Sequence, residues 1–313
     1  MDLSIIIVNW NTRDLLAQCL QSVYDTVQGL AFEVFVVDNA STDGSADMVR
    51  ERFPDVRLIE NAENVGFARA NNQAIRESCG RHVLLVNSDV IILPGTVARL
   101  RQALDQNEGV AVAGVVPIGP DGSVQSYYGS FPTVLSEIFG ISWLQDFTKP
   151  WSKCRIGRKP VHESPFLTDR VSACCILVRR AAIDQVGLFD EQFFLFSEEY
   201  DWYLRFKQHG WRIWCDPAAR VVHHWGGSST AMGESAKRLL YRSKRQYYMK
   251  HQGRPAESIL RAGLAVRFTS KALLEMPQML WGDSARTSDL RNTVQLIVDM
   301  MQPLARSDNS GTV

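Results

Sequence analysis

A short apolar run that stops at three polar residues constrains this chain more than any other stretch. The run reads His-Val-Leu-Leu-Val from His82 to Val86, a length typical of a buried β-strand. It ends at Asn87, Ser88 and Asp89, and the proline at position 94 predicts the start of a helix. Open α/β sheets bind ligands at the carboxyl ends of their strands. We therefore predict that Asp89 lies at the binding edge of a sheet.

Strands and helices are predicted to alternate along the first 116 residues. The predicted strands are residues 3–8, 32–37, 56–59, 82–86 and 110–116. This order is typical of a parallel sheet with helices on both faces. Asp38 follows the second strand as Asp89 follows the fourth, so both acids are expected at the same edge. No Gly-x-Gly-x-x-Gly motif follows the first strand, which counts against a dinucleotide-binding dehydrogenase.

Beyond Pro117 this alternation stops. The pattern predicts a hairpin turn at 120–122, strands at 171–178, 211–215 and 220–223, and a helix at 198–209 that Ser197 caps. Residues 131–168 are rich in proline and aromatic side chains and receive no assignment. A loop of that length usually covers a site or is partly disordered.

Charge is balanced overall but not along the chain. The 313 residues carry 34 basic and 34 acidic side chains, yet ten Lys and Arg face a single acid, Glu257, between Lys237 and Lys271. Such a segment suits the phosphates of lipid or nucleic acid, and a solvated charged face explains it equally well. Because an exposed aromatic platform is missing, we expect no nucleic-acid partner.

The end of the chain is predicted to be helical. From Ile259 to Trp281, four charged residues fall on about a third of the helix circumference and the remainder is apolar. A helix of this kind either lies in a membrane interface or packs on the rest of the protein. Because the basic segment adjoins it, we favour an anionic membrane surface.

The cysteines and the first residues indicate the compartment. None of the six cysteines shows C-x-x-C spacing, which counts against a zinc site. The apolar run after Met1 lacks a preceding basic region, so it predicts a first strand rather than a signal peptide. Together with the basic segment, this predicts a cytoplasmic protein on the inner face of the cell membrane.

Three acids cluster at the start of one predicted helix. Glu198, Glu199 and Asp201 are flanked by aromatic residues, which would desolvate them and raise their pKa toward that of a general base. Successive helical positions point about 100° apart, so at most one of the two glutamates faces a reacting hydroxyl. Attraction to the helix dipole explains the same acids equally well. The residues alone therefore leave open which acid acts.

Two further positions suit phosphate or metal. His223 and His224 end a predicted strand, where neighbouring side chains point to opposite faces, so only one of them can face a site. Arg69 stands near the start of a helix behind Gly66, and a helix N-terminus with a guanidinium suits a diphosphate. A surface ion pair is the alternative interpretation of Arg69.

Seven blocks of sequence now occur together in order. They are SIIIVNWN (4–11), VVDNASTDGS (36–45), NVGFARANN (64–72), LVNSD (85–89), VGLFDE (186–191), SEEYD (197–201) and HHWGGSS (223–229). Over about residues 3–230 the chain resembles family-2 inverting glycosyltransferases with the A-type fold, in particular their rhamnosyltransferase-like branch. Seven blocks in one order are far more specific than any single block.

The resemblance implies an α/β fold, a mostly parallel sheet flanked by helices with a C-terminal helical extension. It implies that residues 1–116 form the half that binds a nucleotide sugar. Residues 117–235 would form the acceptor-binding and catalytic half of the same domain. Residues 236–313 would form a basic, amphipathic helical extension, and like residues 131–168 they match nothing in the family.

The resemblance also implies roles for individual residues. The residues expected to bind the nucleotide sugar are Val8, Asn9, Asn11, Asp38, Gly66, Arg69, Asn87 and Ser88, with Asp38 reading the pyrimidine base. Asp89 takes the place of the last acid in the family's D-x-D motif and would hold Mg²⁺ or Mn²⁺ together with His223; a shift of one residue would make that ligand His224. Glu199 aligns with the catalytic base, with Glu198 and Asp201 as alternatives.

Two positions depart from the family pattern. Asn87 stands where the first acid of the metal motif is expected, which leaves one carboxylate for the metal. Glu199 stands where the base is usually an aspartate, so a longer side chain must be accommodated.

Together these features predict an inverting glycosyltransferase for cell-envelope polysaccharide. The favoured donor is rhamnose on dTDP, with UDP as the other base, and the acceptor is a glycan or a polyprenyl-diphosphate-linked sugar. A nucleotidyltransferase is the first alternative, but Asn9-Trp10-Asn11 stands where its glycine-rich basic loop would be. A non-catalytic sugar- or lipid-binding module is the second. The oligomeric state stays open.

Overall fold

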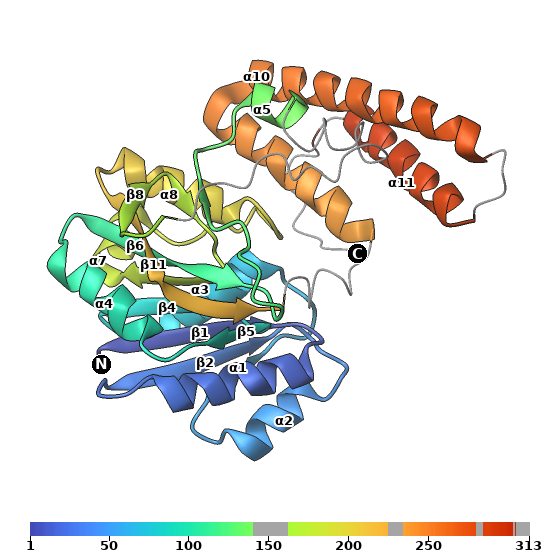
Figure 1. The fold of residues 1–313 in the computed structure, drawn as a ribbon. Coiled ribbons are helices and arrows are strands. Elements are labelled where there is room, and N and C mark those ends of the chain that lie inside the picture. Colours follow the sequence, from blue (N-terminus) through green and yellow to red (C-terminus); the bar gives the residue numbers. More distant parts are fainter. Residues whose placement is uncertain (140–161, 225–233, 280–283, 303, 305–313) are drawn as a thin grey trace. The chain divides into compact units, whose positions relative to one another are not determined.

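The computed structural model describes residues 1–139, 162–224, 234–279, 284–302 and 304. These residues form two compact units (Figure 1). The first contains residues 1–131 and 162–224. The second contains residues 132–139 and the described residues from 234 onward.

A nine-stranded mixed sheet organises the described part of the first unit, in the order β3-β2-β1-β4-β10-β6-β11-β5 with β8 beside β11. The strands are β1 Leu3–Asn9, β2 Phe32–Asp38, β3 Arg57–Glu60, β4 His82–Asn87, β5 Val90–Ile92, β6 Val110–Ile118, β8 Phe166–Thr168, β10 Cys175–Arg179 and β11 Arg212–His223. Strands β3, β2, β1 and β4 run parallel, as predicted. Strand β10 is antiparallel to both of its neighbours, β4 and β6.

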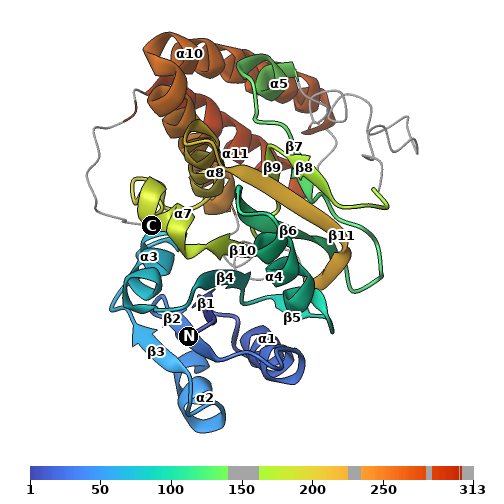
Figure 2. The same ribbon diagram turned by 90° about the vertical axis from the view of Figure 1, so that its left-hand side faces the viewer.

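Helices cover both faces of this sheet (Figure 2). One face carries α1 Arg13–Thr26, α2 Ser45–Arg52 and α4 Thr96–Gln106; the other carries α3 Phe67–Glu77, α7 Arg180–Val186 and α8 Glu198–Gln208. Strand β1 shows why its sequence is a continuous apolar run. Ile5 and Ile7 pack against the first layer and Ile6 against the second, and all three are fully buried.

The single strand predicted at 171–178 is wrong, because residues 172–174 separate two strands. Residues Arg170–Val171 form β9, which pairs with β7 (Tyr128–Gly129) in a separate small sheet. Strand β10 starts only at Cys175. The chain therefore leaves one sheet and joins another within a few residues, which an apolar pattern does not reveal.

Two other boundaries differ from the prediction. The strands predicted at 211–215 and 220–223 are one strand, β11, with an irregular pairing between Cys215 and Arg220. Pro217 lies in this stretch, and a proline cannot donate to a sheet ladder. After Asp89 the short strand β5 intervenes, so helix α4 begins at Thr96 rather than at the proline.

The hairpin turn predicted at 120–122 is confirmed. Gly122 donates to the carbonyl of Gly119 at 2.8 Å, and Ile118 bridges Val124 across the turn. Gly122 adopts φ +76°, a value that glycine reaches without strain.

The second unit is helical. It contains α5 Val134–Phe139, α10 Glu234–Met279 and α11 Ser284–Met301, and both α5 and α11 pack on α10. Helix α10 is broken at Gly253, whose φ of +79° is not helical. Ile138 of α5 packs directly on Gly263 of α10, where a side chain would clash with it.

Much of the basic segment is used inside this second unit. Arg245 forms a buried ion pair with Glu257, its Nε 2.7 Å from Oε1, and also donates to the carbonyl of Asp299. Lys244 pairs with Glu137 at 2.5 Å. Arg267 is only 9% exposed and donates to the carbonyl of Glu137. These charges therefore stabilise helix packing rather than forming one solvated basic face.

The second half of α10 also exposes a line of apolar side chains. Ile259, Val266 and Leu273 follow one another at seven-residue spacing and are 57–67% exposed. Leu135 and Phe139 of α5 are also more than half exposed. No helix in the described ranges combines the length and the apolar character needed to cross a bilayer.

Candidate functional site

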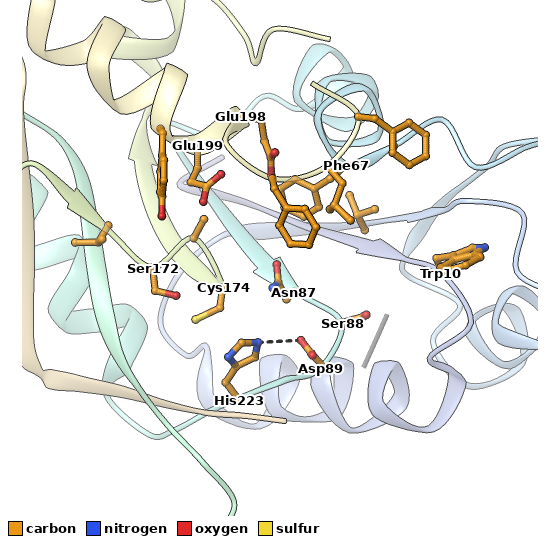
Figure 3. Close-up of a pocket in the computed structure, with 18 of the residues that line it drawn as sticks. Trp10, Phe67, Asn87, Ser88, Asp89, Ser172, Cys174, Glu198, Glu199 and His223 are labelled. Carbon is orange, nitrogen blue, oxygen red and sulfur yellow. Dashed lines mark ion pairs between the residues drawn. The ribbon is translucent and has the colours of Figure 1, made fainter. Parts of the chain in front are cut away.

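A cavity of about 400 Å³ opens at the carboxyl ends of β1 and β4, as the sheet topology predicts (Figure 3). Eight residues predicted from the sequence line it: Val8, Gly66, Asn87, Ser88, Asp89, Glu198, Glu199 and His223. Other lining residues include Trp10, Asn39, Asn64, Phe67, Tyr127, Arg170, Cys174, Phe194 and Tyr200. The cavity therefore gathers polar groups from the edge of the sheet and aromatic groups from the loops around it.

Asp89 and His223 form a pair at one side of this cavity. Oδ1 of Asp89 lies 3.4 Å from Nε2 of His223 (Figure 3), and both side chains are largely buried. The backbone N–H of His224 donates to the carbonyl of Asp89 at 3.0 Å, which fixes the end of β11 beside the corner after β4. His224 does not line the cavity. Between the two histidines, His223 is the one in position to bind a ligand there.

Gln125 determines which nitrogen of His223 carries a proton. Its Nε2 donates to the backbone carbonyl of His223 at 2.8 Å, so its Oε1 is the atom 2.8 Å from Nδ1 of the same histidine. Because an amide oxygen only accepts, Nδ1 must be protonated. In the neutral ring the lone pair of Nε2 then points toward the Asp89 carboxylate. Two such acceptors facing each other suit a cation.

Ser88 is held in place by a chain of side-chain hydrogen bonds to Thr12 and Asn9. Its Oγ lies 2.7 Å from Oγ1 of Thr12, which also donates to Oδ1 of Asn9 at 2.7 Å. The backbone N–H of Asn87 donates to the carbonyl of Cys174. The segment that carries Asp89 is therefore held by both β1 and β10. Thr12 occupies the N-cap position of α1, but its hydroxyl takes part in this chain and makes no capping hydrogen bond.

Glu198 and Glu199 occupy the opposite side of the cavity in Figure 3. Burial raises the pKa of both carboxyl groups, and the charge of Glu199 raises that of Glu198 further. Each has an Oε2 atom that finds no hydrogen-bond partner in the described part of the chain. A buried pair of carboxyls with open acceptor atoms is able to take a proton from a substrate.

The comparison with known proteins decides the family. Residues 4–187, more than half of the chain, match the model of glycosyl transferase family 2. The chain belongs to this family. An L-rhamnosyltransferase from Mycobacterium tuberculosis, named N-acetylglucosaminyl-diphospho-decaprenol L-rhamnosyltransferase, is 30% identical over 256 residues. That alignment covers 75% of this chain and 81% of the relative.

Solved structures confirm the fold of this glycosyltransferase. A mannosyltransferase from Pyrobaculum calidifontis, in complex with GDP-Man and Mn²⁺, superposes with a TM-score of 0.56 at 18% identity, covering 98% of this chain and 88% of that one. Residues 1–349 of TarS from S. aureus superpose at 0.51 with 16% identity, covering 96% and 92%. These structures confirm the A-type fold expected from the sequence. The 30% identical relative confirms the likeness to rhamnosyltransferases.

Two residues with strained backbone conformations directly precede the glutamates of this glycosyltransferase. Phe196 and Ser197, just before α8, both have positive φ values, 68° and 66°. A left-handed residue other than glycine costs roughly 1–2 kcal/mol. Ser197 occupies the predicted cap position, but its side chain makes no capping hydrogen bond. The sequence pattern gave no sign of this strain.

Gly66 connects this strained loop to α3. The carbonyl of Phe194 accepts a hydrogen bond from the N–H of Phe67 at 2.7 Å. A Cβ atom at Gly66 would lie 2.5 Å from that same carbonyl oxygen. The start of α3 and the loop before α8 can therefore approach each other only because residue 66 has no side chain.

Asn9, Asn11 and Asp38, which are predicted to contact the nucleotide, lie outside the cavity lining. Asn9 donates to Oδ1 of Asp38 at 2.9 Å, and Asp38 also accepts from the backbone N–H of Ser41. Oδ1 of Asn11 accepts from the N–H of Thr42 at 2.8 Å. These contacts brace the loop after β2 against the end of β1. Contact of Asn9, Asn11 and Asp38 with a nucleotide stays a prediction.

Two other predicted site residues also lie outside the cavity lining. Arg69 is exposed on α3, and only Gly66 and Phe67 of that helix start line the cavity. Asp201 has no exposed surface and pairs with Arg205, Nε to Oδ2 at 2.8 Å. A base must reach its substrate, so this burial disfavours Asp201 as the base. Contact of Arg69 with a diphosphate stays a prediction.

Sequence reasoning missed Gln125 and Arg170. Gln125 follows the hairpin turn and meets His223 only through tertiary packing. Arg170 enters the cavity because β9 pairs with β7. Nothing in the residue pattern around either position distinguishes it from an ordinary surface residue.

Proposed function

We propose that this glycosyltransferase moves rhamnose from a dTDP donor onto N-acetylglucosamine that is linked through a diphosphate to a polyprenol. The single observation that carries the proposal is that the Asp89–His223 pair and the Glu199 carboxyl open into one cavity. The sugar and the acceptor come from the name of the 30% identical relative. A role in cell-envelope polysaccharide is supported by a 25% identical relative from Myxococcus xanthus, named O-antigen biosynthesis protein RfbC.

The charges around the cavity call for a divalent cation. Three acidic residues and one arginine are among the described residues that line it, so a nucleoside diphosphate would meet little positive charge there. Asp89 and His223 fit Mg²⁺ or Mn²⁺ by their ligand types. Within the described ranges no group of three or more His, Cys, Asp or Glu is placed to hold a metal ion by itself, so donor phosphates and water would complete the coordination. A bound cation would neutralise the charge that develops on the leaving diphosphate.

Glu199 is the proposed base. Its carboxylate removes the proton from the acceptor hydroxyl as that oxygen bonds to the anomeric carbon of the donor sugar. The bond from that carbon to the phosphate oxygen breaks on the opposite face, so the configuration inverts and the nucleoside diphosphate leaves with the electron pair. The raised pKa of Glu199, caused mainly by burial, makes its carboxylate a better proton acceptor.

A direct assay tests this function. The protein is incubated with dTDP-rhamnose or UDP-sugars, Mg²⁺ or Mn²⁺, and N-acetylglucosaminyl-diphospho-polyprenol, and the lipid is analysed by mass spectrometry. We expect a mass increase of one deoxyhexose and release of dTDP. Release of pyrophosphate from a sugar phosphate and a nucleoside triphosphate would instead indicate a nucleotidyltransferase. Binding of the sugar nucleotide without turnover would indicate the non-catalytic module.

We also propose that the second unit docks on the inner surface of the membrane through its apolar face. The exposed residues Ile259, Val266 and Leu273 would enter the lipid interface. Because these side chains are apolar, and because Lys244 and Arg245 are paired within the unit, we expect flotation with anionic vesicles to depend less on salt than binding by the basic segment alone would. Ile259→Asn with Val266→Asn should abolish flotation, and Ser258→Asn, at an exposed polar position, should not. Unchanged flotation of the double variant would contradict docking by this face.

A further inference from the structure

Arg170 occupies a defined position in the wall of the cavity. Its Nε donates to the carbonyl of Ser130 at 3.0 Å, and its Cζ lies 4.9 Å from the ring centroid of Tyr200. The backbone of Arg170 is held by the pairing of β9 with β7. The guanidinium is therefore oriented by a carbonyl and an aromatic face before any substrate binds.

The positive charge of Arg170 has no full counterpart in the described part of the first unit. Among the described residues that line the cavity, it is the only Lys or Arg. No carboxylate lies within ion-pair distance of it in the described part of the first unit, and neither of its Nη atoms has a hydrogen-bond partner there. Arg170 and Glu199 line the same cavity, and Tyr200, over which the guanidinium of Arg170 lies, is the residue that follows Glu199. Arg170 therefore shares the cavity with the proposed base without being paired to it.

We propose that Arg170 binds the phosphate that is attached to the acceptor sugar. This inference rests on the proposed function, in which an acceptor hydroxyl reaches Glu199. The phosphate on the same sugar then lies about one ring width from that hydroxyl, and Arg170 lines the same cavity as Glu199, against the ring of Tyr200. The donor diphosphate belongs to Asp89 and His223, across the cavity in Figure 3.

The chemistry of arginine suits this role. A guanidinium offers two parallel N–H groups to one phosphate and stays charged at any working pH. A sugar that carries no phosphate would leave these N–H groups without an acceptor. Arg170 would therefore select glycosyl diphosphates over neutral sugars, which sets the substrate class of the acceptor side.

Two acceptors separate phosphate binding from a role in positioning Glu199. One is N-acetylglucosamine on a short polyprenyl diphosphate, and the other is an alkyl N-acetylglucosaminide without phosphate. In Arg170→Gln we expect KM for the diphosphate acceptor to rise roughly tenfold or more. KM for the alkyl acceptor and for the donor should stay within about twofold, and Arg170→Lys should recover part of the loss. Arg101→Gln, on the exposed face of α4, is the matched control.

Equal losses with both acceptors, together with a shifted pH profile, would overturn the proposal in favour of Glu199 positioning. A raised donor KM alone would overturn it in favour of the donor phosphates. Calorimetry of the diphosphate acceptor needs no turnover: the wild type should bind it and Arg170→Gln should bind it at least tenfold more weakly. If the wild type and Arg170→Gln bind the diphosphate acceptor equally well, Arg170 does not bind its phosphate. If binding depends on Arg170 but the protein transfers no sugar, only the proposed reaction is refuted. Thermal unfolding of each variant checks that it is folded.

Discussion

Nε2 of His223 lies 3.4 Å from Oδ1 of Asp89, and Gln125 holds the opposite nitrogen of the same ring at 2.8 Å. This arrangement leaves the neutral imidazole with its lone pair facing a carboxylate. The free energy of that contact improves when a cation lies between the two atoms. The geometry therefore favours metal binding even though the family's first acidic position is Asn87.

Replacing Asp89 by Asn should remove metal-dependent binding of the donor. The amide keeps the shape of the side chain but loses the charge that attracts the cation. Calorimetry with a nucleotide sugar should show tighter binding with Mn²⁺ than with EDTA in the wild type, and no such difference in Asp89→Asn. Asp184→Asn, on the exposed side of α7, should behave as the wild type does. A retained metal effect in Asp89→Asn would count against this site.

Replacing Gln125 by Leu should weaken metal-dependent donor binding by roughly tenfold or more, because groups behind metal ligands typically contribute that much. Leucine leaves Nδ1–H of His223 without its acceptor, so the ring is no longer fixed. Gln125→Glu keeps an acceptor and should retain most of the affinity. The same calorimetric titration applies, and full affinity in Gln125→Leu would show that the tautomer of His223 is set elsewhere.

Glu198→Gln should stabilise the protein more at high pH than at low pH. Burial, with the charge of Glu199, raises the folded pKa of Glu198, so the folded state binds its proton more tightly than the unfolded chain does. The wild type therefore loses stability as pH rises from about 4.3, the ordinary pKa of glutamate, toward the raised value. Glutamine removes this loss. Urea unfolding at pH 5 and pH 8 measures it, and a larger gain at pH 5 would contradict the assignment.

Gly66→Ala should lower the free energy of unfolding by more than Gly187→Ala does. Both glycines adopt nearly the same backbone conformation, with φ 84° and ψ 169° against φ 88° and ψ 176°. Both therefore pay the same strain on substitution. Only at position 66 does the new Cβ meet a neighbour, the carbonyl of Phe194, whereas nothing lies within 4 Å at position 187. We expect about 1–3 kcal/mol of extra destabilisation in denaturant unfolding, and equal losses would mean that the loop adapts.

The sequence identified the parts of this site that depend on local order. Asp89 was predicted because an apolar strand ends there, and one of the two histidines because side chains alternate along a strand. Arg69 and Asp201 lie in the first turns of α3 and α8, close in sequence to residues that line the cavity. Sequence position alone does not show which side chains of a first helical turn face a cavity. Gln125 and Arg170 reach the cavity only through pairings between distant segments.

In the second unit, too, the sequence pattern could not predict which side chains are buried. A charge stripe on a helix predicts which residues share a face, but not whether that face points outward. In α10, Arg267 points inward because Glu137 of α5 offers it a carbonyl, and Val266 next to it is exposed. The orientation of such a helix depends on the segments that pack against it. The periodicity of the helix sequence does not identify those segments.

The most direct test of the account separates donor binding from chemistry in Glu199→Gln. This variant keeps Asp89 and His223 but loses the proposed base. Donor affinity is measured by calorimetry with Mn²⁺ and with EDTA, and transfer to the lipid acceptor is measured by mass spectrometry. We predict metal-dependent donor affinity equal to that of the wild type and transfer reduced at least a hundredfold. Transfer at the wild-type rate in Glu199→Gln would contradict the account, whatever its donor affinity.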